Sequence, residues 1–174
     1  MRLEEIRNKI VKGLHEHTGV TIVPTDTADR KPDYPYISYK ITSSHDANTF
    51  SLVDKLIKAA DPKFAHDIQV NRLEQPIITI SINAYGENDG IAYDLAVKAR
   101  DWFTFHGELY FIDLNVVVVN ATNISDRTQQ IVDDYERRHG FDVRIRSARA
   151  IAKRVETIEV YTLDGKIIGK KNKS

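Results

Sequence analysis

The chain has 174 residues, a length that suits one domain, because a chain of about 150 residues buries roughly 70% of its unfolded surface. It contains no cysteine, which excludes disulfide bonds, thiolate catalysis and cysteine-ligated zinc. Its 25 lysines and arginines balance its 25 aspartates and glutamates, so no net charge attracts nucleic acid or an acidic membrane. Neither a signal peptide nor a run of about 18 apolar residues stands out, and we expect a soluble protein made in the cytoplasm.

The first part of the chain predicts a helix, a loop and a strand. Apolar residues recur every three or four positions from Leu3 to Leu14, which is typical of a helix with one buried side, and Gly19 ends it. Residues 24–35 are rich in proline, aspartate and threonine and predict an exposed loop. Residues 36–42 predict a strand.

The next segment, residues 43–66, is rich in serine, aspartate, asparagine and lysine. It offers little apolar surface for packing of its own, so we expect a mobile loop. Within this loop, residues 52–60 are compatible both with a short helix and with a mobile segment.

The middle of the chain predicts three strands and a second helix. Isoleucine alternates with polar residues over residues 78–83, which indicates a strand with one buried face. Asn88 is the expected N-cap of the helix, and Gly107 marks its end. Residues 109–112 and 116–120 predict two further strands, and the valine run of the second indicates a central strand buried on both faces. The apolar side of the helix is formed by Ile91, Leu95, Ala99 and Trp102.

The last third predicts a strand and a terminal hairpin. Phe141, Val143 and Ile145 alternate with charged residues, and a strand over residues 157–163 is followed by a turn and by residues 166–168. Residues 166–174 form a basic C-terminal tail. The fold class is therefore α+β: we expect a single domain over residues 1–165, with a mixed or antiparallel sheet of about 5–7 strands packed against two main helices.

Chemically reactive patterns are weak in this sequence. Asp133, Asp134 and Glu136 form the densest acidic cluster, which would suit a magnesium-dependent nuclease, but arginines follow at once and favour a turn with ion pairs. The histidines lack the spacing of a metal site, and no phosphate-binding loop, dinucleotide fingerprint or nucleophile elbow occurs. We expect a protein that is not an enzyme, with no catalytic residue, metal site or cofactor.

Several segments carry a resemblance to a known family. They are YPYISY at residues 34–39, AYG at residues 84–86, a helix that ends in Trp102 and Phe103, and DYERRHGFDV at residues 134–143. Their order, within residues 34–160, resembles the neck or tail terminator proteins of tailed phages and prophages. The resemblance implies a terminator-like fold.

The resemblance also implies a structural virion protein made in the bacterial host. It would form a ring, commonly a hexamer, on the last layer of the tail tube and beneath the neck proteins. Its partners would then be copies of itself, the tail tube protein and neck or head-completion proteins, while double-stranded DNA passes through the hole and no membrane is involved. A stopper or head-completion protein is the alternative, and a metal-dependent nuclease is a more distant one.

A candidate interface follows from the charges near the second half of the resemblance. The turn and the polar side of the following strand carry both signs of charge, as a head-to-tail contact between identical copies requires. A face that is merely solvated is the alternative. The candidate interface residues are Tyr135, Glu136, Arg137, Arg138, Asp142, Arg144 and Arg146.

Overall fold

Two compact units make up the chain. Unit 1 comprises Met1–Asn48 and Gln75–Ala148, and unit 2 comprises Thr49–Glu74 and Arg149–Ser174. The single domain expected over residues 1–165 stays a prediction. The computed structural model describes residues 3–27, 30–46, 49–62, 64–131, 134–156, 162–163 and 166–167.

Unit 1 is built on a mixed six-stranded sheet. Its strands are β1 (Thr21–Pro24), β2 (Tyr36–Asp46), β5 (Ile77–Tyr85), β6 (Val116–Ala121), β7 (Ser125–Asp126) and β10 (Arg138–Ser147). Their order is β1-β2-β5-β10-β6, with β7 also paired to β10. Only β1 and β2 run parallel among these pairs. The expected α+β fold with a mixed sheet is confirmed.

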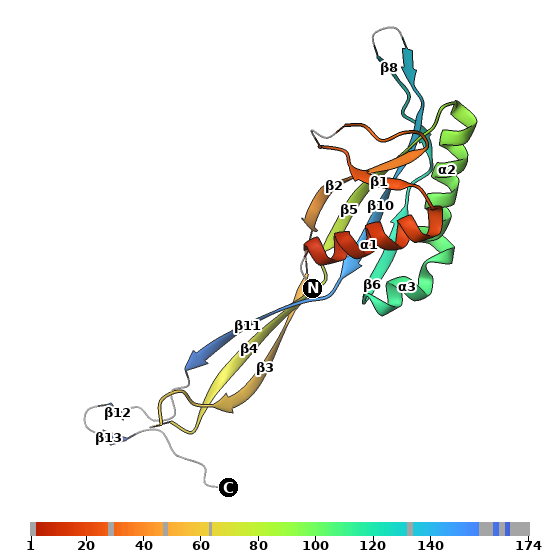
Figure 1. Cartoon of the computed structure of the whole chain (residues 1–174). Helices are drawn as coiled ribbons and strands as arrows, with labels where there is room; N and C mark the ends of the chain where they lie inside the picture. Colours follow the sequence, from red (N-terminus) through yellow and green to blue (C-terminus); the bar gives the residue numbers. More distant parts are fainter. Residues whose placement is uncertain are drawn as a thin grey trace. The chain divides into compact units, whose positions relative to one another are not determined.

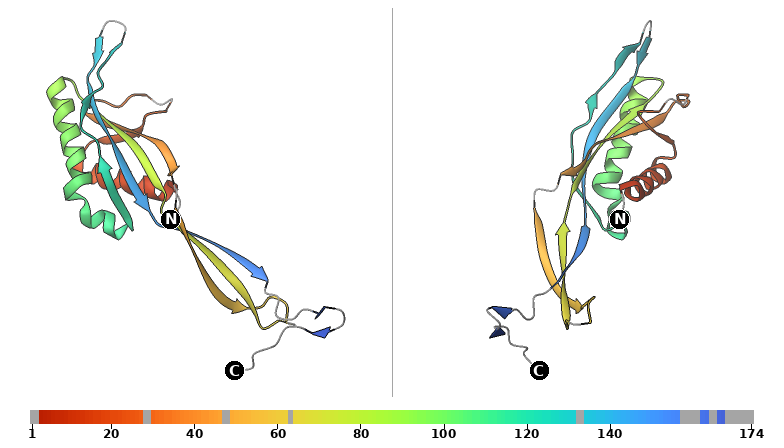
Figure 2. Two further views of the ribbon diagram at one scale, coloured as in Figure 1. Left: turned by 180° about the vertical axis from the view of Figure 1, so that it is seen from behind. Right: turned by 90° about the vertical axis from the view of Figure 1, so that its left-hand side faces the viewer.

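The helices α1 (Leu3–Thr18), α2 (Asp89–Asp101) and α3 (Glu108–Asp113) lie on one face of this sheet (Figure 1, Figure 2). The strands supply an apolar side to them because opposite residues of antiparallel strands share a face, as Ile82 and Phe141 do. The core between helices and sheet includes Ile6, Ile10, Leu14, Ile37, Ile80, Ile82, Leu95, Trp102, Phe103, Phe141, Val143 and Ile145. Core packing expected for Trp102 and Phe103 is confirmed.

The two main helices begin and end as the sequence predicts. The apolar stripe of α1 is buried, and Gly19 follows the helix with a φ of 79°, a conformation that glycine adopts without steric cost. Asn88 caps α2, and its Oδ1 accepts a hydrogen bond from the Ile91 N–H at 2.9 Å. A π-helical turn, η1 (Trp102–His106), continues α2 as far as Gly107.

In this unit one strand prediction is wrong, and a second predicted strand is present but lies elsewhere in the sheet than expected. Residues 109–112 belong to α3, in which Phe111 is buried while Leu109 and Ile112 are exposed, and the C-cap residue Leu114 is buried as well. The valine run forms β6, which lies at the edge of the sheet and not at its centre. Its central valines are accordingly exposed or only half-buried.

Unit 2 is a three-stranded antiparallel sheet. Its strands are β3 (Phe50–Lys58), β4 (His66–Glu74) and β11 (Arg149–Glu156), in the order β11-β4-β3. The short helix considered for residues 52–60 is therefore wrong, and much of the expected loop 43–66 is strand, because β4 supplies a pairing partner that lies beyond the segment. The mobility of residues 43–66 stays a prediction. In the chain, β2 leads into β3, β4 into β5 and β10 into β11.

Two small pairs complete the described structure. β8 (Gln129–Ile131) pairs with β9 (Asp134–Glu136), and β12 (Thr162–Leu163) pairs with β13 (Lys166–Ile167), as the expected terminal hairpin requires. Residues 157–161 of the expected strand and residues 168–174 of the basic tail lie outside the described residues. Among the helices that the structure describes, none has the length and apolar character needed to cross a membrane.

Candidate interaction surfaces

In the described part of unit 1, one face of the sheet is free of helices and carries polar side chains. The register places Asp142 opposite Ser81 and Arg144 opposite Thr79 on this face. Phe141, Val143 and Ile145 point the other way and are fully buried. The predicted division of β10 into an apolar and a charged side is therefore confirmed.

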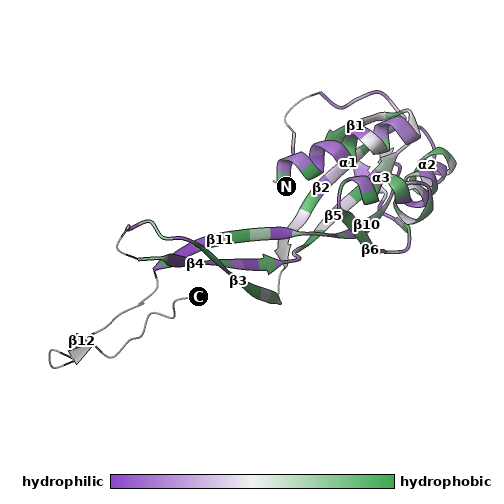
Figure 3. Ribbon diagram, turned by 90° about the horizontal axis from the view of Figure 1, so that it is seen from below, coloured by the Kyte–Doolittle hydropathy of each residue, from purple (hydrophilic) through white to green (hydrophobic). Residues whose placement is uncertain are grey.

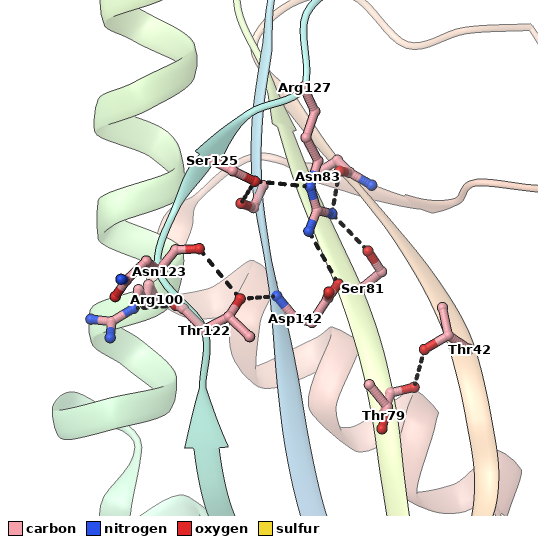
Figure 4. A network of polar contacts seen from close by, with 11 residues as sticks. Thr42, Thr79, Ser81, Asn83, Arg100, Thr122, Asn123, Ser125, Arg127 and Asp142 are labelled. Carbon is pink, nitrogen blue, oxygen red and sulfur yellow. Dashed lines mark hydrogen bonds and ion pairs between the residues drawn. The ribbon is translucent and has the colours of Figure 1, made fainter.

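Arg127 organises the helix-free face (Figure 4). One guanidinium nitrogen, Nη1, donates to Ser81 Oγ at 2.8 Å and to Asn83 Oδ1 at 3.0 Å. Nη2 lies 3.3 Å from Asp142 Oδ1, and Nε donates to Ser125 Oγ at 3.3 Å. The fork of donors thus ties the segment after β7 to β5 and β10. Sequence reasoning missed Arg127, because no local pattern connects it with Ser81 and Asn83, 46 and 44 residues earlier in the chain.

Gly140 leaves the space that this network needs. It lies opposite Asn83 on β5 and Ser125 on β7. A Cβ at this position would stand 2.5 Å from Asn83 Oδ1, 2.6 Å from the Ile82 carbonyl oxygen and 3.0 Å from Arg127 Cδ. The glycine of the YERRHGFD segment therefore has a packing reason, since strands otherwise disfavour glycine.

A second cluster joins the loop before β2 to the end of β9. The Lys31 ammonium binds Glu136 and donates to the Tyr34 hydroxyl at 2.7 Å. Burial by itself would lower the pKa of Lys31, but the hydrogen bonds to Glu136 and Tyr34 raise it above its ordinary value. The ring of Tyr36 stacks on that of Tyr85 at 4.5 Å, and burial raises the pKa of the Tyr36 phenol. Lys31 therefore stays charged and Tyr36 neutral at pH 7.

The candidate interface residues differ in their exposure and in their contacts. Glu136, Arg138 and Asp142 contact their own chain, since Arg138 donates to the Arg127 carbonyl and lies 3.4 Å from the Tyr85 hydroxyl. Tyr135 and Arg146 are exposed. Arg137 and Arg144 are half-buried, and the guanidinium of Arg137 lies 4.8 Å from the centre of the Tyr135 ring. The structure thus turns only part of the predicted set outward.

Of the acidic cluster considered for a nuclease, the structure describes only the side chain of Glu136. The carboxylate of Glu136 binds Lys31. Asp133 and the side chain of Asp134 are outside the part of the chain that the structure describes. A different group, Asp89, Asp126 and His139, brings three possible metal-binding atoms within 4.8 Å of one another. His139 is buried and its Nε2 lies 2.8 Å from Asp89 Oδ1, so a structural hydrogen bond accounts for its position.

Apolar residues gather on the surface of unit 1 around α3. Phe105, Leu109 and Ile112 are 73%, 76% and 62% exposed, and Val117 on β6 is also exposed. A hollow of about 390 Å³ is lined by residues of η1, α3 and β6, among them Glu108, Ile112 and Val117. We call Phe105, Leu109 and Ile112 the α3 patch; Val117 lies outside it, because the register places it opposite Arg146 on the helix-free face. Contiguous exposed apolar residues of this kind mark sites of protein association.

Unit 2 exposes a second group of apolar residues, on strands whose ribbons carry both hydrophobic and hydrophilic colours in Figure 3. Leu52 and Leu56 on β3 are 61% and 65% exposed, and Ile151 and Val155 on β11 are also exposed. The register places these four on one face, because Leu52 and Ile151 both lie opposite Arg72 while Leu56 and Val155 both lie opposite Ile68. We call this surface the β3–β11 face. In the part of the chain that the structure describes, no helix belongs to this unit.

Exposed apolar residues and a sheet face with charges of both signs are typical of a protein that associates with other proteins. A comparison with protein families agrees: the family described as phage neck terminator protein matches residues 8–171. The chain belongs to this family, and the predicted resemblance is confirmed. It is therefore a structural component of the phage neck, and thus of the virion. No match was found among curated proteins.

Proposed function

We propose that this chain closes the head-proximal end of the phage tail tube as a hexameric ring and joins the tube to the neck proteins. Membership in the neck terminator family is the observation that carries the proposal. DNA passes through the ring, and the protein acts by assembly and not by catalysis. The charged face of the sheet supports this role, because charges of both signs fix the register between identical copies.

Within this ring, the exposed members of the candidate set contact a neighbouring copy or the tail tube. Tyr135 and Arg146 are exposed, and the side chains of Arg137 and Arg144 are accessible in part. Asp142, held by Arg127, fixes the strand that presents them. Glu136 and Arg138 hold the turn to the rest of the sheet and contribute indirectly.

Purified chain mixed with tail tubes that lack it tests the role directly. We expect a terminal layer on one end of each tube, seen by electron microscopy and by cosedimentation. Tubes that stay bare at both ends would contradict tail capping. Binding to DNA-filled heads in place of tubes would indicate a stopper or head-completion protein.

Charge reversal tests the interface in the phage. The Arg144→Glu/Arg146→Glu variant should fold but fail to complement a phage that lacks this gene, leaving tails unjoined to heads, because like charges across an interface cost several kcal/mol. The matched control is Lys9→Glu/Lys12→Glu, which makes the same charge change on the exposed side of α1. Normal yields from a stably folded Arg144→Glu/Arg146→Glu variant would mean that this face is only solvated.

Incubation with DNA and Mg²⁺ tests the non-enzymatic role. We expect intact DNA. Cleavage that is lost in the Asp134→Asn variant would show a nuclease and contradict the proposal.

A further inference from the structure

The two units carry opposite charge. Unit 1 contains 14 lysines and arginines against 18 aspartates and glutamates, whereas unit 2 contains 11 against 7. The balanced composition of the whole chain therefore hides an acidic unit and a basic unit. Each unit also exposes an apolar surface, the α3 patch in unit 1 and the β3–β11 face in unit 2.

The charge that α3 itself carries is acidic. From Asp101 to Asp126 the sequence holds four carboxylates and no lysine or arginine. Two of the four, Glu108 and Asp113, are the first and last residues of α3, and both are exposed. Glu108 also lines the hollow beside Ile112. A partner of this patch must offer apolar side chains together with positive charge.

The β3–β11 face meets this requirement. Its four apolar residues share a face with Arg72, Arg149 and Lys153, as the strand register shows. The two arginines bind the buried Glu74. Nη2 of Arg72 lies 3.2 Å from one carboxylate oxygen, and Nη1 of Arg149 lies 2.7 Å from the other. Lys58 stands on the same face, opposite His66. Four basic residues thus share this face with the exposed apolar ones, against the carboxylates of Glu74 and of Asp54, which lies opposite Val70, whereas α3 carries only carboxylates.

We propose that the β3–β11 face of one copy binds the α3 patch of a second copy. The two surfaces match in apolar character and are opposite in charge, which favours this occupant over DNA, since phosphate contacts do not bury leucine and isoleucine. The contact joins different surfaces of identical chains, so repetition gives a ring when the rotation closes. The inference rests on the proposed ring and names the surfaces that build it.

Charge exchange between two variants tests the contact. The patch variant is Glu108→Lys/Asp113→Lys, and the face variant is Lys58→Glu/Lys153→Glu. In each variant, the α3 patch and the β3–β11 face carry charge of the same sign, so copies of one variant repel each other at this contact. We expect each variant alone to self-associate about tenfold or more weakly than wild type. An equal mixture should recover assembly, because each variant then offers the surface that the other needs, and the rings should alternate between the two chains.

The control for the patch variant is Glu4→Lys/Asp94→Lys, which makes the same charge change at exposed positions outside both surfaces. It should assemble like wild type. Thermal unfolding of every variant separates loss of assembly from loss of folding. Variants that associate like wild type, or a mixture that recovers nothing, would overturn the proposal.

Cross-linking identifies the occupant, because the chain has no cysteine of its own. Leu109→Cys chains mixed with Leu52→Cys chains and a short bifunctional thiol reagent should give a heterodimer, and neither variant alone should give dimers. Using two single variants excludes a link within one chain. The reaction is run on purified chain over a range of concentrations and on phage particles that contain both variants.

The outcomes distinguish this inference from the proposed function. Chain present in particles without the Leu109–Leu52 product overturns the contact and leaves the neck role intact. Chain absent from particles contradicts the neck role, and the purified mixture then decides the contact alone. Cross-links to the tail tube protein would identify that protein as the partner in place of a second copy. DNA binding that the face variant loses would identify DNA as the partner instead. Absence of the product in both settings overturns the proposal.

Discussion

Close contacts around single residues set the shape of the helix-free sheet face. At Gly140, backbone and side-chain oxygens approach to 2.5–2.6 Å of where a Cβ would stand. We expect Gly140→Ala to lower the free energy of unfolding by about 1–3 kcal/mol, because the Ile82 carbonyl cannot move without disturbing the β5–β10 ladder. Denaturant unfolding measures the change.

The matched control for this substitution is Gly90→Ala in α2. The nearest atom to a Cβ there is Asn88 Oδ1 at 3.5 Å, and alanine favours a helix over glycine. That variant should be as stable as wild type or slightly more stable. Equal stability of both alanine variants would show that the sheet yields at Gly140.

The stability of the folded protein should depend on pH through His17. Burial and the positive charges of His106 and Lys98 lower this pKa below its ordinary value. The unfolded chain then binds a proton more readily than the folded chain, so stability falls as the pH drops through about 6.5. Melting temperatures measured from pH 8 to pH 5 should fall less in His17→Asn than in wild type, and parallel curves would contradict the prediction.

Single residues also show where the sequence misleads. Glu136 and Arg138 stand in a run of charges that predicts a surface, yet they bind Lys31 and Arg127 of their own chain. These partners lie in loops, and no periodic pattern links one loop to another. Arg144 and Arg146 were placed correctly, because alternation along a strand fixes the side to which each residue points.

At the scale of elements, β10 separates the contributions of core and surface. Val143→Asp places a charge where the side chain is fully buried. We expect a loss of about 3–5 kcal/mol, or failure to fold. Arg146→Glu on the exposed side of the same strand should change the free energy of unfolding by about 0.5 kcal/mol or less. Similar losses in both variants would contradict the assignment of the two faces.

In unit 1, the two features that the sequence predicts wrongly share one cause. In α3, exposed Leu109 and Ile112 fill the positions between buried residues and hide the helical period. In β6, the exposed Val117 and Val119 complete an unbroken valine run, which is the sequence pattern of a strand buried on both faces. Apolar residues in a single sequence indicate burial but not what buries them, so surfaces that await a partner look like core. The helices α1 and α2 and the strands β5 and β10 follow from the sequence because the same chain buries their apolar sides.

At the scale of the whole molecule, the two units should differ in local stability. All of β11 and most of β3 are exposed, whereas β5 and β10 form the core of unit 1. Amide hydrogens of β3 and β11 should exchange faster in the free chain, and limited proteolysis should cut within residues 43–66 before residues 78–85. Equal protection of both regions would mean one cooperative domain and no mobile segment.

The strand connections give the sheet of unit 1 a mechanical property. β2, β5 and β10 each continue in the sequence into a strand of unit 2, and the register brings Asp46, Ile77 and Arg146 together at one end of the sheet. Tension on unit 2 therefore draws the three central strands in the same direction, and the hydrogen-bond ladders between them carry no shear. The load falls on the outer ladders, to β1 and β6, and on the packing of α1 and α2 against the sheet.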